Sequence, residues 1–252
     1  NTIPAFKRAI ELGVNTLELD VVISKDNIVV VSHEPYMNPV ICKDIEGNEI
    51  PRSDGLKYNL YKMTFDSIKT FDCGTKFHPR FPKQEKIKVN KPSLNEVIKV
   101  SKELNPYIKF NIELKARPKY YGVYTPNPRE FVQLVLEVIK DHDAFRETNL
   151  QSFDLNILEE IKSQSTDMKV ALLVDENEVI SEKIKSLSYK PEIISPYFKL
   201  LTKDSVILYQ EKGYQVIPWT VNSVKDMNHI IGFQVDGIIT DYPDRLIDLI
   251  NN

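Results

Sequence analysis

From Pro92 to the end of the chain, short apolar segments typical of strands alternate with amphipathic segments typical of helices. Repeated strand-then-helix units predict parallel strands joined by helical crossovers, which is an α/β fold. The expected strands lie at 107–114, 149–152, 169–174, 193–195, 215–221 and 237–240. The expected helices lie at 94–104, 131–139, 155–161, 179–187, 205–212, 224–231 and 246–250.

The N-terminal part contributes one more unit. A helix with Pro4 in its first turn is expected to stop at Gly13, and a strand at 16–22 follows directly. With the strand at 16–22 included, the chain has seven strand-then-helix units. The first helix stands before all of them and has no strand in front of it. We therefore expect a (β/α)8 TIM barrel whose first strand lies before Asn1 and is missing from the given chain. An open doubly wound sheet is the alternative, but only 8 glycines and no Gly-rich phosphate loop are present.

Residues 35–92 do not follow this alternation. They are rich in Pro, Asp, Asn, Lys and Gly, and they come after the second barrel strand and its expected hairpin partner at 28–31. We interpret 35–92 as an insertion subdomain within a single barrel domain spanning 1–252. The lysines within it are expected to form a solvated face: Lys83, Lys86, Lys88 and Lys91.

Composition narrows the functional classes. The chain has 252 residues, 42% hydrophobic and 27% charged, which suits one large soluble domain. A net charge of −3 argues against a nucleic-acid partner. No apolar run is long enough to span a membrane, so no stable membrane insertion is expected. Cys42 and Cys73 do not make a disulfide framework, and no Cys/His cluster has zinc spacing.

The sequence does not determine the oligomeric state or the compartment. We favour the cytoplasm slightly, and a location outside it stays open, because the segment expected before Asn1 would carry any export signal.

Two acids stand two residues apart in the apolar strand 16–22. Alternate strand residues share a face, so Glu18 and Asp20 project together, away from their apolar neighbours. The strand at 107–114 brings Glu113 and Lys115 to a shared face in the same way. Carboxylates from two strands predict an oxygen-ligand site for Ca²⁺ or Mg²⁺. The alternative is a solvated edge strand, since paired acids on a buried strand repel each other.

Active sites of such barrels form at the carboxyl ends of the strands. Polar or aromatic residues at these ends are the candidates: Glu18, Asp20, His33, Glu113, Lys115, Gln151, Ser152, Trp219, Thr220, Asn222 and Asp241.

An ordered set of short motifs resembles the glycerophosphodiester phosphodiesterase family. Each motif is weak alone, but together they span nearly the whole chain in the expected order. They are Asn1-Thr2-Ile3-Pro4-Ala5-Phe6, Gly13, Glu18-Leu19-Asp20-Val21, Ser32-His33-Glu34-Pro35, Ile112-Glu113-Leu114-Lys115, Ser152-Phe153-Asp154, Trp219-Thr220-Val221-Asn222 and Asp236-Gly237-Ile238-Ile239-Thr240-Asp241-Tyr242-Pro243. The resemblance implies a barrel enzyme that hydrolyses glycerophosphodiesters to glycerol 3-phosphate and an alcohol with a divalent cation.

The resemblance also implies roles for single residues. Glu18, Asp20 and Glu113 would be the metal ligands, and His33 would be one of two catalytic histidines. Lys115 would help to hold the phosphate, although a structural ion pair with Glu113 is compatible with that role.

Phe153 and Trp219 would shape the wall around the glycerol or its substituent. Their alternative role is core packing.

One departure from the family pattern concerns the N-terminus. The family carries a His-Arg-Gly motif at the end of its first strand, and this chain starts after the corresponding point. We expect that motif to precede Asn1. Two other functions are kept open: a related phospholipase that acts on intact lipids, and a catalytically inactive phosphodiester-binding barrel.

Overall fold

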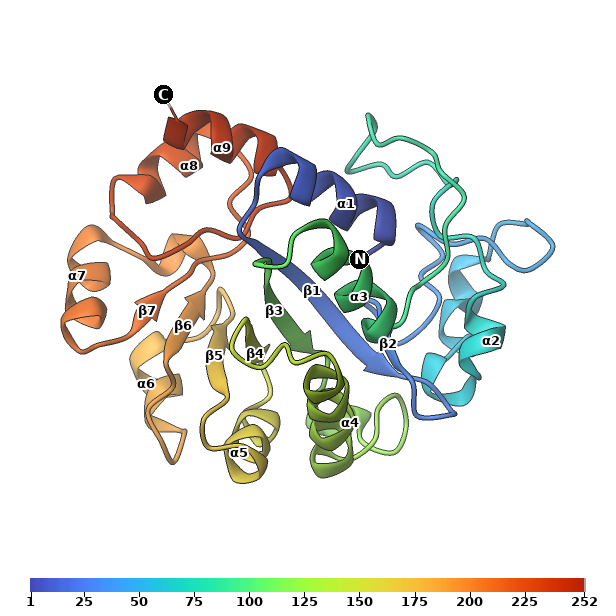
Figure 1. The fold of residues 1–252 in the computed structure, drawn as a ribbon, viewed down its shortest axis with the longest axis horizontal. Helices are drawn as coiled ribbons and strands as arrows, with labels where there is room; N and C mark the ends of the chain where they lie inside the picture. The colour runs from blue at the N-terminus through green and yellow to red at the C-terminus, as the bar shows by residue number, and fades with distance from the viewer. Residues whose placement is uncertain (252) are drawn as a thin grey trace.

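The computed structural model describes residues 1–251 and has a parallel β-sheet at its centre (Figure 1). The order of its seven strands is β2-β1-β3-β4-β5-β6-β7. Strand β2 pairs antiparallel with β1, and every other neighbouring pair is parallel. The strands are β1 Thr16–Ile23, β2 Val29–Val31, β3 Lys109–Leu114, β4 Thr148–Ser152, β5 Lys169–Val174, β6 Ile193–Pro196 and β7 Gln215–Val216.

Helices surround the outer face of this sheet. The C-terminal helix lies beside the N-terminal one, so the helical layer comes full circle (Figure 1). The architecture is that of a (β/α)8 barrel, as predicted, but within residues 1–251 the sheet is not closed: β2 and β7 are its edges. The helices are α1 Ile3–Leu12, α2 Phe65–Ile68, α3 Leu94–Leu104, α4 Pro128–Asp141, α5 Leu155–Gln164, α6 Ile180–Lys185, α7 Lys203–Glu211, α8 Val224–Ile231 and α9 Pro243–Asn251.

The last expected strands differ most from the structure. Strand β7 ends at Val216, and 237–240 forms no regular strand. The two segments still lie side by side, because Ile239 N–H donates to Pro218 O and Val221 N–H donates to Ile239 O. Pro218 has no N–H to donate, which interrupts the regular ladder at this point.

The local sequence explains how β1 is placed. Helix α1 ends at Gly13, whose φ of +94° is a left-handed conformation that favours glycine. The chain then turns directly into β1. At the start of α3, Ser93 and Glu96 form a capping box. None of the helices in the described part of the chain has both the length and the apolar composition that a membrane crossing needs.

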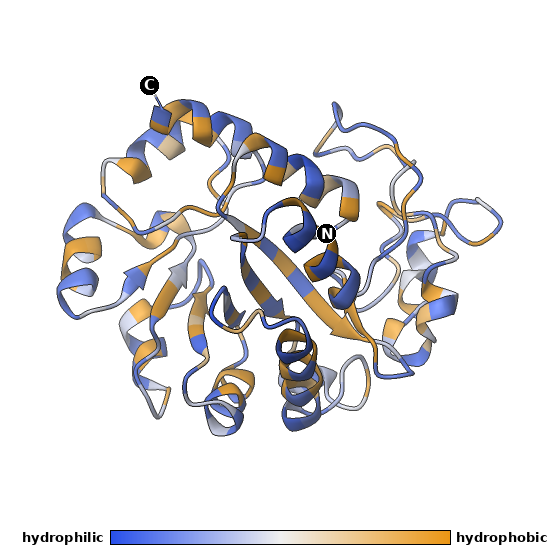
Figure 2. Cartoon of the chain, viewed as in Figure 1, coloured by the Kyte–Doolittle hydropathy of each residue, from blue (hydrophilic) through white to orange (hydrophobic). Residues whose placement is uncertain are grey.

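The main hydrophobic core lies between the sheet and its helices. Leu17, Leu19 and Val21 of β1 belong to it and are nearly inaccessible to solvent. Figure 2 shows the resulting alternation of apolar and polar bands along β1. The residues of β1 that alternate with Leu17, Leu19 and Val21 therefore point to the opposite, inner face of the sheet.

Residues 35–92 lie beside β1 and β2 and have a hydrophobic core of their own (Figure 1). That core includes Val22, on the inner-face side of β1, together with Val30 of β2. The segment contains α2 and the short 3-10 helices Arg52–Lys57 and Leu60–Lys62; a third, Pro118–Tyr120, follows β3, and a fourth, Phe198–Leu200, follows β6. We propose that 35–92 is an insertion subdomain that extends the inner face of β1.

A disulfide joins Cys42 to Cys73 within this segment. The pairing was not predicted from the sequence, where two cysteines alone did not indicate a framework. Backbone hydrogen bonding explains it: Lys43 N–H donates to Asp72 O over 2.7 Å, which sets the neighbouring cysteines beside each other. The bridge connects the two ends of a stretch of chain that surrounds the small core.

We expect loss of this disulfide to destabilise the protein. Changing both Cys42 and Cys73 to Ala should lower the free energy of unfolding by about 2 to 4 kcal/mol, because the unfolded chain gains freedom. Urea denaturation with and without reductant measures the effect. A wild-type unfolding curve that does not respond to reductant would contradict it.

Candidate active site

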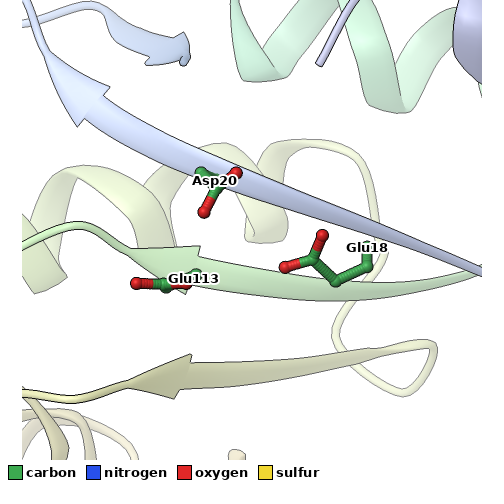
Figure 3. A group of neighbouring side chains, drawn as sticks. All are labelled: Glu18, Asp20 and Glu113. Carbon is green, nitrogen blue, oxygen red and sulfur yellow. The ribbon is translucent and has the colours of Figure 1, made fainter. Parts of the chain in front are cut away.

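Three carboxylates meet on the inner face of the sheet. Glu18 and Asp20 come from β1, and Glu113 comes from β3 (Figure 3). One oxygen atom of each lies within 4.8 Å of the others. Asp20 and Glu113 are buried, with 4% and 7% of their surfaces exposed, and Glu18 is half-buried. The structure therefore brings together the three acids that were singled out in the sequence.

Strand register places these acids. Asp20 is the pairing partner of Glu113, and Glu18 is the partner of Asn111 two positions earlier. Because parallel strands in register keep the same residues on the same face, all these polar side chains point inward. Their apolar neighbours occupy the helix-facing core, so the register cannot slip by one residue without burying the acids there.

Lys115 lies against the acidic cluster. Its Nζ is 3.0 Å from Glu113 Oε1 and 3.4 Å from Asp20 Oδ1. Burial disfavours the charged amine, but the two carboxylates outweigh burial, and the pKa of Lys115 is raised. The ion pair between Lys115 and Glu113 that was considered in the sequence analysis is therefore present. The Lys115 ammonium stays beside the acidic cluster, where it can also attract a bound anion.

Burial and mutual repulsion set the proton affinity of the acids. Burial, followed by the charges of Asp20 and Glu113, holds the pKa of Glu18 well above its ordinary value. Burial likewise raises the pKa of Glu113 to about 7, although Lys115 opposes the rise. Burial acts on Asp20 in the same direction, but Lys115, His33 and a hydrogen bond from Asn1 outweigh it and lower its pKa. Without a further cation, the cluster retains protons.

A chain of amides supports the cluster from β3 and β4. Gln151 Nε2 donates to Glu18 Oε1 over 2.9 Å, and Asn111 Nδ2 donates to Gln151 Oε1 over 3.1 Å. Asn149 in turn donates to Asn111 Oδ1. These bonds fix the orientation of the Glu18 carboxylate. The supporting role of Asn111 was not predicted, because it depends on the pairing of β3 with β4.

His33 lies just past β2, next to Ser32, whose backbone N–H donates to Asp20 O. Its Nδ1 is 3.0 Å from Glu34 Oε1, and this hydrogen bond raises the pKa of the imidazole. Asp20 adds a smaller effect in the same direction. The His33 side chain is 62% exposed, so the imidazole is accessible to a molecule from solvent. Glu34 was part of a sequence motif, but its contact with the ring was not predicted.

Phe153 and Trp219 pack together after β4 and β7. Their rings meet edge to face with centroids 5.4 Å apart, and Trp219 Nε1 donates to Ser195 O over 2.8 Å. Phe153 also lines a cavity of about 630 Å³, together with Ala116. Its remaining lining residues are Arg117, Pro118, Lys119, Asp154, Asp175, Glu178 and Lys183.

The sequence interpretation of Lys91 is wrong. Lys91 was assigned to a solvated basic face with Lys83, Lys86 and Lys88, but only 4% of its surface is exposed. Its Nζ donates to Ser32 Oγ over 2.8 Å. The other three lysines are exposed. Lys91 differs because Pro92 O accepts a hydrogen bond from Val31 N–H, which draws this end of the segment against β2.

The donor set at the acidic cluster suits a hard divalent cation. Carboxylate oxygens are the ligands that Ca²⁺ and Mg²⁺ prefer, and a dication would offset the repulsion that raises two of the pKa values. In the part of the chain that the structure describes, Glu18, Asp20 and Glu113 are the group of acids placed to hold such an ion.

The parallel sheet, with polar side chains gathered at the ends of its strands, defines a barrel enzyme. The chain belongs to the glycerophosphoryl diester phosphodiesterase family, whose model matches residues 1–245. This match agrees with the family resemblance found in the sequence motifs.

Known relatives agree over almost the full chain. A glycerophosphodiester phosphodiesterase of Caldanaerobacter subterraneus subsp. tengcongensis is 29% identical over 250 residues, which cover 99% of this chain and 91% of the relative. A crystal structure from Silicibacter pomeroyi DSS-3, assigned as a glycerophosphoryl diester phosphodiesterase, has a TM-score of 0.88 and 27% identity, and the match covers 99% of this chain and 88% of that one.

A third protein shares the fold. An Oleispira antarctica phosphodiesterase, solved with the product sn-glycerol-3-phosphate, has a TM-score of 0.79 and 21% identity, and the match covers 100% of this chain and 91% of that one.

We expect the stability of the metal-free protein to depend on pH. Between the ordinary pKa of glutamate, 4.5, and the pKa of about 7 that burial gives Glu113, the folded state holds a proton that the unfolded state has released. The free energy of unfolding should therefore fall as pH rises through this range, by up to about 3 kcal/mol. The lowered pKa of Asp20 makes the free energy of unfolding rise with pH instead, but this effect is confined to pH values below the ordinary aspartate pKa of 3.8.

Urea denaturation in the presence of a chelator measures this dependence. Glu113→Gln should make the profile shallower, with the remaining slope due to the raised pKa of Glu18, whereas the exposed Glu211→Gln should leave the profile unchanged. Parallel profiles for Glu113→Gln and the wild type would contradict the assignment.

Proposed function

We propose that this protein hydrolyses glycerophosphodiesters to glycerol 3-phosphate and an alcohol, and that it requires a divalent cation. The observation that carries the proposal is the inward-facing cluster of Glu18, Asp20 and Glu113 in a chain of this family. The family match and the relatives support the reaction class. The cluster supports the requirement for a metal, either Ca²⁺ or Mg²⁺.

In this proposal Glu18, Asp20 and Glu113 hold the cation. When bound, the ion supplies positive charge that polarises the phosphoryl oxygens and offsets charge that develops during hydrolysis. Gln151 keeps the Glu18 carboxylate oriented through its 2.9 Å hydrogen bond. Lys115, held beside the cluster by two ion pairs, attracts the anionic phosphodiester to the same point.

His33 is proposed to move protons during the reaction. Hydrolysis forms a bond from a water oxygen to phosphorus and breaks the bond from phosphorus to the alcohol oxygen; the water loses a proton, and the alcohol gains one. Histidine suits either transfer, because its pKa lies near neutrality. Glu34 accepts at Nδ1 and therefore leaves Nε2 to face the substrate.

Phe153 and Trp219 are proposed to form an apolar wall for the glycerol or its substituent. Their edge-to-face contact fixes both rings, and Phe153 borders the cavity of about 630 Å³. The same cavity carries charges of both signs at Lys183 and Asp175, so the alcohol portion would meet polar groups beyond the wall.

We expect Glu113→Gln to abolish metal-dependent hydrolysis. The neutral amide removes one anionic ligand, so the affinity for Ca²⁺ or Mg²⁺ should fall at least about a hundredfold. Isothermal titration with each ion measures affinity, and release of choline from glycerophosphocholine measures turnover. Glu211→Gln, on the exposed side of α7, is the matched control and should behave as the wild type.

Three results would contradict this function. Turnover that persists unchanged with excess chelator would refute the role of the metal. Hydrolysis of phosphatidylcholine vesicles without hydrolysis of glycerophosphocholine would indicate the phospholipase alternative. Binding of glycerophosphocholine without turnover would indicate the inactive binding barrel.

We expect His33→Gln to lower kcat by about a hundredfold or more, because a proton-transfer group is lost. The affinity for the metal should stay close to that of the wild type, since His33 is not one of the clustered acids. His229→Gln is the matched control, because His229 is exposed on α8. Equal kcat values for His33→Gln and His229→Gln would remove His33 from the reaction.

A further inference from the structure

A buried lysine of the segment 35–92 lies beneath the turn that carries His33. Lys91 is 4% exposed, and its ammonium donates to Ser32 Oγ over 2.8 Å. Burying an ammonium is costly unless nearby groups compensate for the lost water. Burial lowers the pKa of Lys91 to about 8, and the acids that act against this shift are Glu34 and Asp20. Lys91 therefore contacts the residue directly before His33, and Ser32 N–H in turn donates to Asp20 O of the acidic cluster.

The hydrogen bonds around Ser32 form a directed chain. Lys91 Nζ donates to the Ser32 hydroxyl oxygen. The hydroxyl hydrogen of Ser32 therefore points away from Lys91, and it is donated to Glu34 O over 2.6 Å. The backbone N–H of Ser32 donates to Asp20 O over 2.9 Å. The turn of residues 32–34 is thus tied to the segment 35–92 on one side and to β1 on the other.

This turn determines where the imidazole points. The Glu34 carboxylate accepts at His33 Nδ1 over 3.0 Å. Although burial would favour a protonated Glu34, His33 and Lys91 together lower its pKa and keep it ionised. Loss of the Lys91 ammonium would remove both the hydrogen bond to Ser32 and part of the charge that keeps Glu34 an acceptor.

We propose that Lys91 is a positioning residue, which acts through Ser32 to hold the turn that aims His33 at the substrate. The inference rests on the proposed hydrolase function. Lys91 would touch neither the substrate nor the metal. Its contribution would be to fix the tautomer and the direction of the His33 ring, so removing it should lower kcat and leave KM and metal affinity unchanged.

Turnover of glycerophosphocholine by the intact protein provides the first test. Lys91→Met should lower kcat about tenfold, as loss of a residue that orients a reacting group does. Ser32→Ala should give a similar loss. The double variant should be no worse than either single one, because both changes break one chain. Lys88→Met is the matched control: Lys88 is an exposed lysine of the same segment, and its kcat should not change.

Imidazole ¹⁵N resonances provide a second test that does not depend on turnover. At a pH where the ring is neutral, His33 should carry its proton on Nδ1 in the wild type and exchange between both tautomers in Lys91→Met. His33→Gln assigns the signal. If Lys91→Met does not fold, Ser32→Ala tests the same chain with the same expected results.

A wild-type kcat in Lys91→Met, additive losses in the double variant, or an unchanged tautomer would each overturn the role of Lys91. A wild-type protein without turnover would instead refute the hydrolase proposal, and the imidazole resonances would still decide whether Lys91 orients His33.

Discussion

The register between β1 and β3 is the constraint on which the site depends. It sets Asp20 opposite Glu113 and places Glu18 one step back on the same face. Like charges at this separation repel each other, and burial adds to the cost. The half-buried ammonium of Lys115 offsets part of that cost, and the two glutamates offset more of it by holding protons more tightly than usual. Carboxylate oxygens grouped in this way suit a hard divalent cation.

The two faces of β1 contact different parts of the protein. Leucine and valine at alternate positions anchor the strand in the core between sheet and helices. The intervening positions carry Glu18 and Asp20 and then Val22, which enters the small core of residues 35–92. The same strand face therefore holds the acids and attaches the segment that buries Lys91. Packing in that segment is in this way coupled to the geometry around His33.

Much of the fold could be predicted because strand and helix periodicity are local properties. The parallel sheet follows from the alternation, and the acids of β1 and β3 were recognised from their spacing. The last expected strand was wrong because hydrogen bonding across Pro218 decides whether 237–240 joins the ladder. The roles of Glu34 and Asn111 were missed for a related reason: both depend on partners that only the folded chain brings near.

Sequence alone determined that Glu18 and Asp20 project to one side of a strand and that strand-then-helix units repeat, since both follow from backbone geometry over a few residues. Tertiary structure decided the strand register that sets Glu113 opposite Asp20, how Lys115 is shared between Glu113 and Asp20, and that Cys42 pairs with Cys73. It also decided that Lys91 is buried while Lys88 is exposed. Burial and long-range pairing depend on how distant segments pack, and no local pattern records that packing.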